Sequence, residues 1–236
     1  MNNKGNLFLI PTAIADETQQ IIMPPQVTDR LPDIRFFLAE NIRTARRYLS
    51  SLKLYEKIDD LHFSTLNKDT KEEQLADLFV PALSGHHLGV ISEAGCPGVA
   101  DPGSLAVRFA HKNGIKVIPM VGPSAILLSL MASGLNGQQF AFHGYLPIQP
   151  NEASKAIREL EKESAAKNQT QIFIETPYRN NNLFNHLTRY LKPGTELCVA
   201  FDITGQHEFI LTRPVREWRS QPVELPKNPA VFLFLA

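Results

Sequence analysis

Small and acidic residues are concentrated between positions 92 and 103, directly after the apolar run 89–92 (GVIS). Glycine permits backbone conformations that other residues avoid, and small side chains let a ligand approach the main chain. Asp101 stands where a following helix would need its N-cap, so a plain strand-to-helix turn explains 101–103 (DPG). That turn does not explain the additional glycines and proline at 95–98 (GCPG). Since ligand loops of open α/β sheets follow the carboxyl ends of strands, we interpret 92–103 as a ligand loop.

Two further turns of small residues accompany this loop. The apolar run 7–10 leads into Pro11, Thr12 and an alanine, and 121–125 (VGPSA) opens a long apolar helical pattern. The second turn is equally consistent with a hinge between domains that also starts a helix. No GxGxxG follows the first run and no GxxxxGK[ST] is present, so neither a dinucleotide nor a nucleoside triphosphate is indicated.

Carboxylates and amides follow several strand-like runs. Glu40 follows 35–39, and Glu175 ends 171–175. A carboxylate that projects into a cleft can act as a general base, although a solvated side chain at a strand end explains either residue as well. Asn67 and Lys68 follow the third run and can orient a substrate.

Basic residues recur at helical spacing in the pattern 42–52. Arg43, Arg46 and Arg47 fall at i, i+3 and i+4, hence on one face of a helix. They can hold the phosphates of an RNA, or they form an ordinary solvated basic face. The histidines have no partner spacing that suits a metal ion, and no metal site is expected.

Strand-like runs alternate with amphipathic patterns, which predicts two α/β domains, 1–120 and 121–236. The last two strand-like runs lack a long helix between them, which predicts that they pair in antiparallel fashion. In the first half the runs are 7–10, 35–39, 61–65, 89–92 and 116–120, with helical patterns at 42–52, 71–83, 105–112 and 124–133. In the second half the runs are 140–146, 171–175, 196–203, 208–213 and 231–236, with helical patterns at 152–167 and 181–191.

Composition limits the classes of partner. The 236 residues contain 24 basic and 24 acidic side chains, so broad electrostatic capture of nucleic acid is not indicated, whereas a local basic patch remains open. Two cysteines are too few for a disulfide framework. Because no apolar segment approaches the length of a signal peptide core or of a membrane span, we expect a cytoplasmic protein without a membrane partner.

Several motifs, taken in order, resemble those of one family. The strings "SEAGCPGVADPG", "VGPSAILLSLMASGL" and "FAFHGYLP" resemble S-D-A-G-T-P-x-x-S-D-P-G, P-G-P-S-A with A-S-G-L, and F-x-F-x-G-F-L-P. "LFLIPTAIAD", "AENIRTARRYL" and "FIETPYR" match further motifs on either side. The resemblance spans almost the whole chain. It is to the tetrapyrrole methylase superfamily and, within it, to the ribosomal RNA small-subunit methyltransferase I family, which methylates a cytidine ribose 2′-hydroxyl.

The resemblance implies two α/β domains of the tetrapyrrole methylase type, with S-adenosylmethionine in the cleft between them and a homodimeric assembly. It implies ribosomal RNA or the small ribosomal subunit as the partner. The cofactor positions that it implies are Pro11, Thr12, Ser92, Glu93, Ala94, Gly95, Ala100, Asp101, Ser124, Leu146, Thr176, Ile203 and Thr204. Glu40 and Glu175 are the catalytic candidates, and Arg43, Arg46, Asn67 and Lys68 are the candidates for substrate binding.

The chain departs from the family at several polar positions on the expected substrate side. Gly-Asn is replaced at 15–16 (AD), Glu-Asp-Thr-Arg at 40–43 (ENIR), His-Asn at 66–67 (LN) and Arg-Glu-Leu-Thr-Lys at 201–205 (FDITG). The motifs assigned to the cofactor match those of the family more closely. Two alternatives to RNA methylation therefore stay open. One is the same fold methylating a tetrapyrrole-like small molecule or a protein, and the other is a non-catalytic module that binds S-adenosylmethionine.

Overall fold

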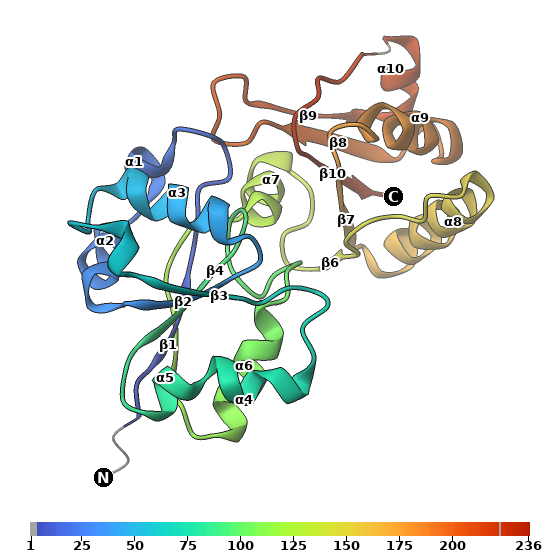
Figure 1. The fold of residues 1–236 in the computed structure, drawn as a ribbon. Coiled ribbons are helices and arrows are strands. Elements are labelled where there is room, and N and C mark those ends of the chain that lie inside the picture. The colour runs from blue at the N-terminus through green and yellow to red at the C-terminus, as the bar shows by residue number, and fades with distance from the viewer. Residues whose placement is uncertain (1–3, 222) are drawn as a thin grey trace. The chain divides into compact units, whose positions relative to one another are not determined.

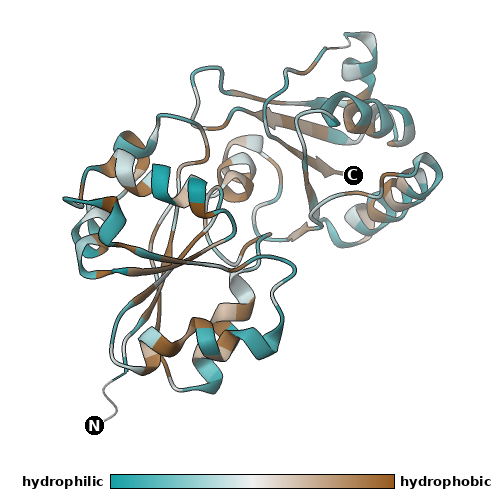
Figure 2. Cartoon of the chain, viewed as in Figure 1, coloured by the Kyte–Doolittle hydropathy of each residue, from teal (hydrophilic) through white to brown (hydrophobic). Residues whose placement is uncertain are grey.

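The computed structural model describes residues 4–221 and 223–236, which form two compact units, Met1–Ser124 and Ala125–Ala236 (Figure 1). Each unit has one five-stranded sheet covered by helices, so the predicted α/β class is confirmed. Figure 2 shows apolar residues concentrated on the strands and polar residues on the outer sides of helices. Within the described residues, no helix is long and apolar enough to cross a membrane.

The first unit is built on a parallel sheet with the strand order β3-β2-β4-β1-β5. Its central strand β4 is buried along its whole length, as expected for a parallel strand covered on both faces. The register sets Ile10 beside Ile91 and Ile91 beside Ala39, so the carboxyl ends of β1, β4 and β2 lie level. The strands are β1 (Leu7–Ile10), β2 (Phe36–Ala39), β3 (His62–Thr65), β4 (Leu88–Ile91) and β5 (Val117–Pro119).

Helices cover the two faces of this sheet in sequence order (Figure 1). Those that follow β1 and β2 pack with one buried cluster, through residues such as Val27 and Leu49, and those that follow β3 and β4 pack with another, through Leu75 and Ala106. The first set is α1 (Gln19–Ile22), α2 (Pro25–Arg30), η1 (Leu31–Asp33), α3 (Ile42–Leu52) and η2 (Ile58–Asp60). The second set is η3 (Glu72–Gln74), α4 (Leu75–Leu78), α5 (Val80–Leu83) and α6 (Gly103–Lys112).

Local chemistry explains where two of these elements begin and end. Helix α3 forms over the predicted range because the Asn41 side chain accepts the backbone N–H groups of Arg43 and Thr44 at 3.0 and 3.2 Å. The single helix predicted over 71–83 is wrong, since the chain forms η3, α4 and α5 instead. Pro81 lacks an N–H and its ring crowds the preceding turn, and the backbone leaves helical geometry at Phe79.

The second unit contains a mixed sheet with the order β6-β7-β10-β8-β9. Strands β6 and β7 are parallel, and the other neighbours are antiparallel. Helix α7 covers one face, and α8, α9 and α10 cover the other. The strands are β6 (Phe140–Phe142), β7 (Thr170–Glu175), β8 (Glu196–Phe201), β9 (Phe209–Pro214) and β10 (Ala230–Leu235). The helices are α7 (Ala125–Ser133), α8 (Pro150–Lys167), α9 (Asn180–Tyr190) and α10 (Val215–Ser220).

The expected pairing of the last two strands is wrong. Strand β10 lies between β7 and β8, and β9 pairs with β8 at the edge. Strand β10 (AVFLFL) is buried over all but its last residue, so it belongs where both faces are covered, whereas every residue of β9 is half-exposed. Helix α10 makes the connection and buries Val215 and Trp218.

Candidate functional site

The carboxyl edge of the first sheet brings together predicted site residues from several strands. Thr12, Glu40 and Ser92 follow β1, β2 and β4, whose ends the register sets level, and Asn67 follows the neighbouring β3. The connections that leave β1 and β4 cross to opposite faces of the sheet. In open α/β sheets, ligands bind at the carboxyl end where neighbouring strands diverge in this way.

A closed set of hydrogen bonds joins the ends of β1 and β4. Thr12 and Gly95 form an isolated antiparallel bridge, with the N–H of each donating to the carbonyl of the other. The Thr12 hydroxyl donates to the Ser92 carbonyl at 3.3 Å, and the Ser92 hydroxyl donates to the Gly95 carbonyl at 2.8 Å. Thr12, Ser92 and Gly95 are buried. The turn after β1 and the loop after β4 are therefore held as one structure.

The loop between β4 and α6 has three residues in the left-handed backbone region. Gly95, Gly98 and Ala100 have φ values of +72°, +82° and +61°. The Asp101 carboxylate accepts the N–H of Gly98 at 2.6 Å and that of Gly103, the first residue of α6, at 2.8 Å. The prediction that Asp101 is the N-cap of this helix is wrong by one residue, since Pro102 holds the N-cap position and Asp101 reaches the first N–H of the helix from the residue before it. Predicted cofactor residues on the loop, Glu93, Ala94 and Ala100, have exposed side chains.

The turn after β5 packs against the same edge. A Cβ atom on Gly122 would lie 2.1 Å from the Cβ of Pro11, so only glycine allows this approach. The Cys96 thiol donates to the Pro123 carbonyl at 3.3 Å. Burial, and secondly the negative charge of Asp101, raise the pKa of that thiol. The turn places Ser124, a half-buried residue, at the end of the first unit.

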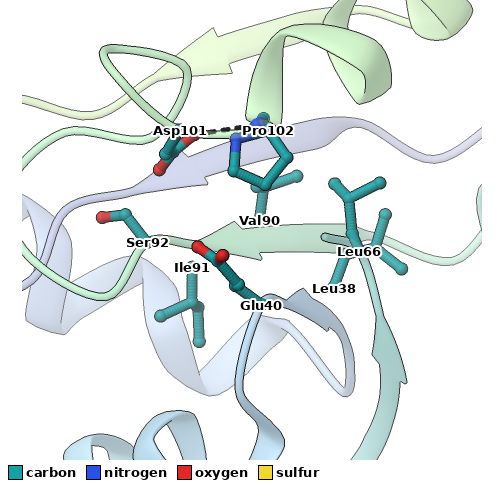
Figure 3. A pocket seen from close by; sticks show the side chains of 9 residues that line it. Leu38, Glu40, Leu66, Val90, Ile91, Ser92, Asp101 and Pro102 are labelled. Atoms are coloured by element: carbon teal, nitrogen blue, oxygen red, sulfur yellow. Dashed lines mark hydrogen bonds between the residues drawn. The ribbon is translucent and has the colours of Figure 1, made fainter. Parts of the chain in front are cut away.

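Glu40, the first catalytic candidate, lies at a small cavity at the ends of β2, β3 and β4 (Figure 3). The cavity has a volume of about 10 Å³, which is the size of one water site. Figure 3 shows the carboxylates of Glu40 and Asp101 and the hydroxyl of Ser92 around it. Glu40 is exposed, and its carboxylate has no hydrogen-bond or ion-pair partner among the residues that the structure describes.

Some of the predicted substrate residues form ion pairs or hydrogen bonds with neighbouring residues, and others do not. Arg46 forms an ion pair with Asp59 and lies over the ring of Phe63, 5.5 Å from its centroid. The Asn67 side-chain oxygen accepts the Asp69 N–H at 3.0 Å and so serves a local turn. In contrast, Arg43 and Lys68 are exposed and have no ion pair within residues 4–221 and 223–236.

A larger pocket of about 520 Å³ lies between the loop after β1, helix α3 and the end of β4. Thr44, Arg47, Tyr48 and Ser51 supply the α3 side of it. No sequence motif predicts the α3 side of this pocket, whereas Thr12, Ser92 and Glu93 of the predicted cofactor set also line it. The available signal was the spacing of these four residues, i, i+3, i+4 and i+7, which puts polar groups on one face of a helix. The Tyr48 hydroxyl donates to the Pro11 carbonyl at 2.9 Å, and burial raises the pKa of Tyr48.

In the second unit, Glu175 is an anchored carboxylate at the end of β7. Its side chain is 1% exposed and forms an ion pair with Arg179 at 2.9 Å. The other carboxylate oxygen accepts the N–H of Thr176 at 2.7 Å. Glu175 therefore fixes Thr176, a predicted cofactor residue. Leu146, another predicted cofactor residue, is buried in the cluster covered by α8, α9 and α10.

The turn between β8 and β9 is strained. Asp202 and Thr204 have φ values of +51° and +68°, a region that a β-branched residue such as threonine rarely enters. The Thr204 N–H donates to Glu208 at 2.7 Å, and the His207 N–H donates to Asp202 at 2.8 Å. The Thr204 hydroxyl oxygen is buried and has no hydrogen-bond partner among the described residues. Ile203, the neighbouring predicted residue, is buried in the core beneath α7.

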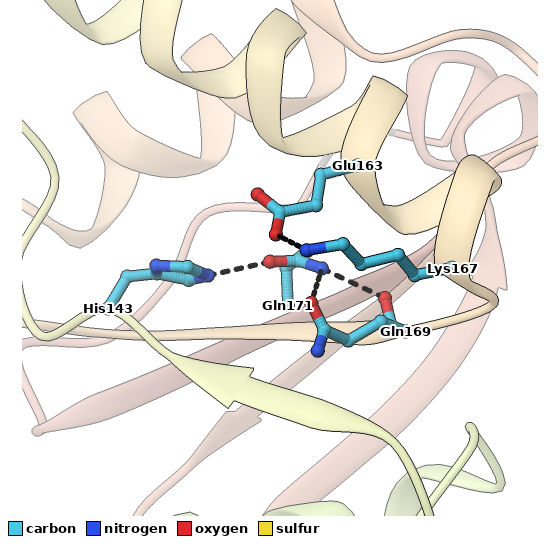
Figure 4. A network of polar contacts seen from close by, with 5 residues as sticks. All are labelled: His143, Glu163, Lys167, Gln169 and Gln171. Carbon is cyan, nitrogen blue, oxygen red and sulfur yellow. Dashed lines mark hydrogen bonds and ion pairs between the residues drawn. The ribbon is translucent and has the colours of Figure 1, made fainter.

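A polar network on β6, β7 and α8 lies outside the predicted site residues (Figure 4). The His143 ring meets the Gln171 side-chain oxygen at 2.6 Å, and the Gln171 amide donates to the Gln169 carbonyl at 3.0 Å. Nearby, Lys167 bonds Glu163 at 2.5 Å and lowers the pKa of that carboxyl. Since Gln171 is fully buried, we interpret the network as the means of satisfying its amide. No group of three or more potential ligands among the described residues can hold a metal ion.

No protein-family model matches the chain. A ribosomal RNA small subunit methyltransferase I of Vibrio cholerae is 30% identical over 239 residues, which cover 98% of this chain and 77% of that protein. The Halalkalibacterium halodurans protein of the same name is 33% identical over 219 residues, which cover 92% and 70%.

Solved structures share the fold. The methyltransferase CobJ matches with a TM-score of 0.62 and 17% identity, over 97% of this chain and 93% of its own. A uroporphyrin-III C-methyl transferase from Thermus thermophilus, complexed with S-adenyl homocysteine, matches with a TM-score of 0.60 and 16% identity, over 98% and 97%.

Proposed function

Because the chain belongs to the ribosomal RNA small subunit methyltransferase I family, we propose that it transfers a methyl group from S-adenosylmethionine to small-subunit ribosomal RNA. The acceptor in this proposal is the 2′-hydroxyl of a cytidine ribose. The observation that carries it is the joined edge of β1 and β4, where hydrogen bonds among Thr12, Ser92 and Gly95 fix the loop after β4. Such an edge suits a ligand that is recognised by backbone groups.

The residues proposed to hold the cofactor are those implied by the resemblance, and the local structure fits such a ligand. Backbone strain and an unpaired buried hydroxyl occur together at Thr204, which is where a ligand would supply the missing partner. When bound, S-adenosylmethionine supplies an electrophilic methyl group on a sulfonium. The proposed set in the first unit is Pro11, Thr12, Ser92, Glu93, Ala94, Gly95, Ala100, Asp101 and Ser124, and in the second it is Leu146, Thr176, Ile203 and Thr204.

Of the two catalytic candidates, Glu40 is proposed to accept the proton of the acceptor hydroxyl. Its carboxylate is exposed and without a partner among the described residues, as a base that meets a substrate must be. Glu175 is proposed as a positioning residue, because its two oxygens are engaged by Arg179 and by the N–H of Thr176. Methyl transfer needs an aligned nucleophile, so much of the rate depends on positioning.

The RNA is proposed to contact exposed basic and polar groups at the same edge. Arg43 and Lys68 supply positive charge there, with Arg46 and Asn67 beside them on α3 and after β3. With a formal net charge of zero, only a local patch of this kind is available for phosphate contacts. The resemblance implies a homodimer, and a ribosomal partner implies a cytoplasmic protein; we propose both.

The proposal is tested by incubating the protein with radiolabelled S-adenosylmethionine and small ribosomal subunits from a strain that lacks the gene. Label on one cytidine of the RNA is expected, and Glu40→Gln should lower kcat while cofactor affinity is kept. Cofactor binding without transfer to RNA would contradict the proposed acceptor. A failure of calorimetry to detect S-adenosylmethionine binding at millimolar concentration would contradict the proposed cofactor.

A further inference from the structure

The pocket between the loop after β1 and helix α3 adjoins the small cavity at Glu40 but has its own lining. The two share only Ile91 and Ser92, at the end of β4. Its volume of about 520 Å³ lies within the range of about 300 to 1,000 Å³ of small-molecule sites, whereas the cavity at Glu40 has room for one water. It is therefore large enough to take a nucleotide.

Small side chains supply part of the lining of this pocket. They are Ala13 and Ala15 on the loop after β1 and Ala45 and Ser51 on α3. Helix α1, which continues the loop, buries none of its residues.

The charges of the lining select the kind of ligand. Asp16 and Glu17, on the loop after β1, contribute carboxylates, and both side chains are exposed. Thr12, Ser92 and Glu93, which are proposed to hold the cofactor, line the end of the pocket next to β4. Carboxylates accept hydrogen bonds from exocyclic amino groups of bases, such as N4 of cytosine. They repel phosphates, so the body of the pocket suits a base that carries an amino group and disfavours a run of phosphodiesters.

One cation stands among these acids. Arg47 lines the pocket, and the structure gives it no ion pair within the described residues, although Arg46 beside it is paired with Asp59. A guanidinium without a partner matches one phosphate in bidentate geometry. One cation and several acceptors together match a single nucleotide: a phosphate at Arg47 and an amino-bearing base at the carboxylates.

We propose that this pocket receives one nucleotide of the RNA acceptor, extruded from its neighbours, with Arg47 on its phosphate and the acids of the loop on an exocyclic amine. The inference rests on the proposed function and names the part of the site that reads the acceptor. It predicts preference for cytosine over uracil, since uracil has a carbonyl where cytosine has its amine. Extrusion suits an enzyme whose target must enter a pocket.

The test measures nucleotide binding and methyl transfer separately, in the full chain. Cytidine and uridine monophosphates are titrated by NMR against protein saturated with S-adenosylhomocysteine, and KM for small ribosomal subunits is measured with the same variants. We expect cytidine monophosphate to bind about tenfold more tightly than uridine monophosphate. Arg47→Ala should weaken nucleotide binding and raise KM, each by about tenfold.

Ser51→Trp fills the pocket from the α3 side and should abolish nucleotide binding. Arg108→Ala, which removes an exposed arginine from α6 on the other face of the sheet, is the matched control and should change neither quantity. S-adenosylhomocysteine affinity and the thermal midpoint establish that each variant is folded. If Arg47→Ala keeps the wild-type KM, or if the two nucleotides bind equally, the pocket proposal is overturned.

A failure of the proposed function has a different result. Wild-type protein would then label no RNA in any ribosomal fraction, while the nucleotide titration would still report on the pocket. Tight binding of cytidine monophosphate that Ser51→Trp removes would support the pocket even in that case. Wild-type transfer to RNA that is unchanged in Ser51→Trp would overturn the pocket and leave the proposed function standing.

Discussion

Thr12 and Gly95 exchange two backbone hydrogen bonds, from the Thr12 N–H to the Gly95 carbonyl at 2.9 Å and from the Gly95 N–H to the Thr12 carbonyl at 3.2 Å. Gly95 has a φ of +72°, and an added Cβ would lie 3.3 Å from the Pro123 carbonyl. Glycine is therefore required here for its conformation, and the bridge makes the shape of the loop after β4 depend on the turn after β1.

The first prediction concerns the hydroxyl that supports this bridge. Thr12→Val keeps the shape of the side chain and removes its contacts with Ser92, at 3.3 Å to the carbonyl and 3.4 Å to the hydroxyl. We expect the free energy of unfolding to fall by about 1 kcal/mol and the affinity for S-adenosylmethionine to fall as the loop loosens. Urea denaturation and calorimetry measure the two effects. Wild-type values for both would show that the hydroxyl is dispensable.

The second prediction concerns the carboxylate that shapes the loop before α6. Asp101→Ala leaves the N–H groups of Gly98 and Gly103 without the acceptor that they now share at 2.6 and 2.8 Å. A loss of about 1–3 kcal/mol in the free energy of unfolding is expected from chemical denaturation. Asp29→Ala, at an exposed position of α2, is the control and should stay within about 0.5 kcal/mol of wild type. Equal effects of the two substitutions would contradict a structural role for Asp101.

The third prediction concerns the reactivity of Cys96. Burial, and to a smaller extent the charge of Asp101, raise its thiol pKa, so the thiolate forms at a higher pH than in free cysteine. In a Cys198→Ser background, iodoacetamide should alkylate Cys96 more slowly than free cysteine at pH near 8, and the rate should rise only at higher pH. Asp101→Asn should shift that rise to lower pH, because it removes the negative charge. Mass spectrometry of alkylation against pH is the measurement. A profile that coincides with free cysteine would be incompatible with the raised pKa.

Elements with local signals could be predicted from the sequence. Helix α3 has its cap at Asn41, and α7 ends at Ser133, before Gly134 with a φ of +72°. The interruption at Pro81 could also be predicted, because proline breaks a helix interior. The apolar spacing around Pro81 instead indicates one continuous helix. The central position of β10 in its sheet could not be predicted from the sequence, because strand order depends on contacts between distant segments.

The candidate site divides in the same way. That polar residues after parallel strands meet at one edge follows from topology alone, so Thr12, Glu40 and Ser92 could be placed together. The bridge from Thr12 to Gly95 and the ion pair of Glu175 with Arg179 join partners that no local pattern connects to a site. The residues of α3 that line the larger pocket have helical spacing in the sequence, but the same spacing is typical of an ordinary solvated helix face.

The fourth prediction concerns Glu161, a buried carboxylate of α8. It accepts the Lys192 N–H and the Thr195 hydroxyl, both at 2.6 Å, and so ties α8 to the connection between α9 and β8. Glu161→Ala should lower the free energy of unfolding of the second unit by about 2–3 kcal/mol, because a buried hydroxyl and a partly buried N–H lose their acceptor. Glu159→Ala removes an exposed carboxylate from the same helix, whose ion pair with Lys155 is 4.0 Å long, and should cost at most about 0.5 kcal/mol. Near-equal costs would refute the anchoring role.

The fifth prediction separates the two roles considered for Glu175. Arg179→Ala leaves a carboxylate that is 1% exposed without its ion-pair partner, and we expect a loss of about 3–5 kcal/mol in the free energy of unfolding. Adding Glu175→Gln to that variant removes the uncompensated charge and should recover part of the loss. Denaturation of the three variants measures this cycle.

The activity of Glu175→Gln alone then identifies the role. Its oxygen still accepts the Thr176 N–H, so a positioning residue should lower cofactor affinity modestly and leave the pH dependence of kcat unchanged. A general base would instead lose most of kcat while cofactor affinity stayed the same. Glu40→Gln is the matched comparison, because it alters the exposed carboxylate of the other catalytic candidate without disturbing an ion pair. A collapse of kcat in Glu175→Gln, with Glu40→Gln active, would transfer the proposed base from Glu40 to Glu175.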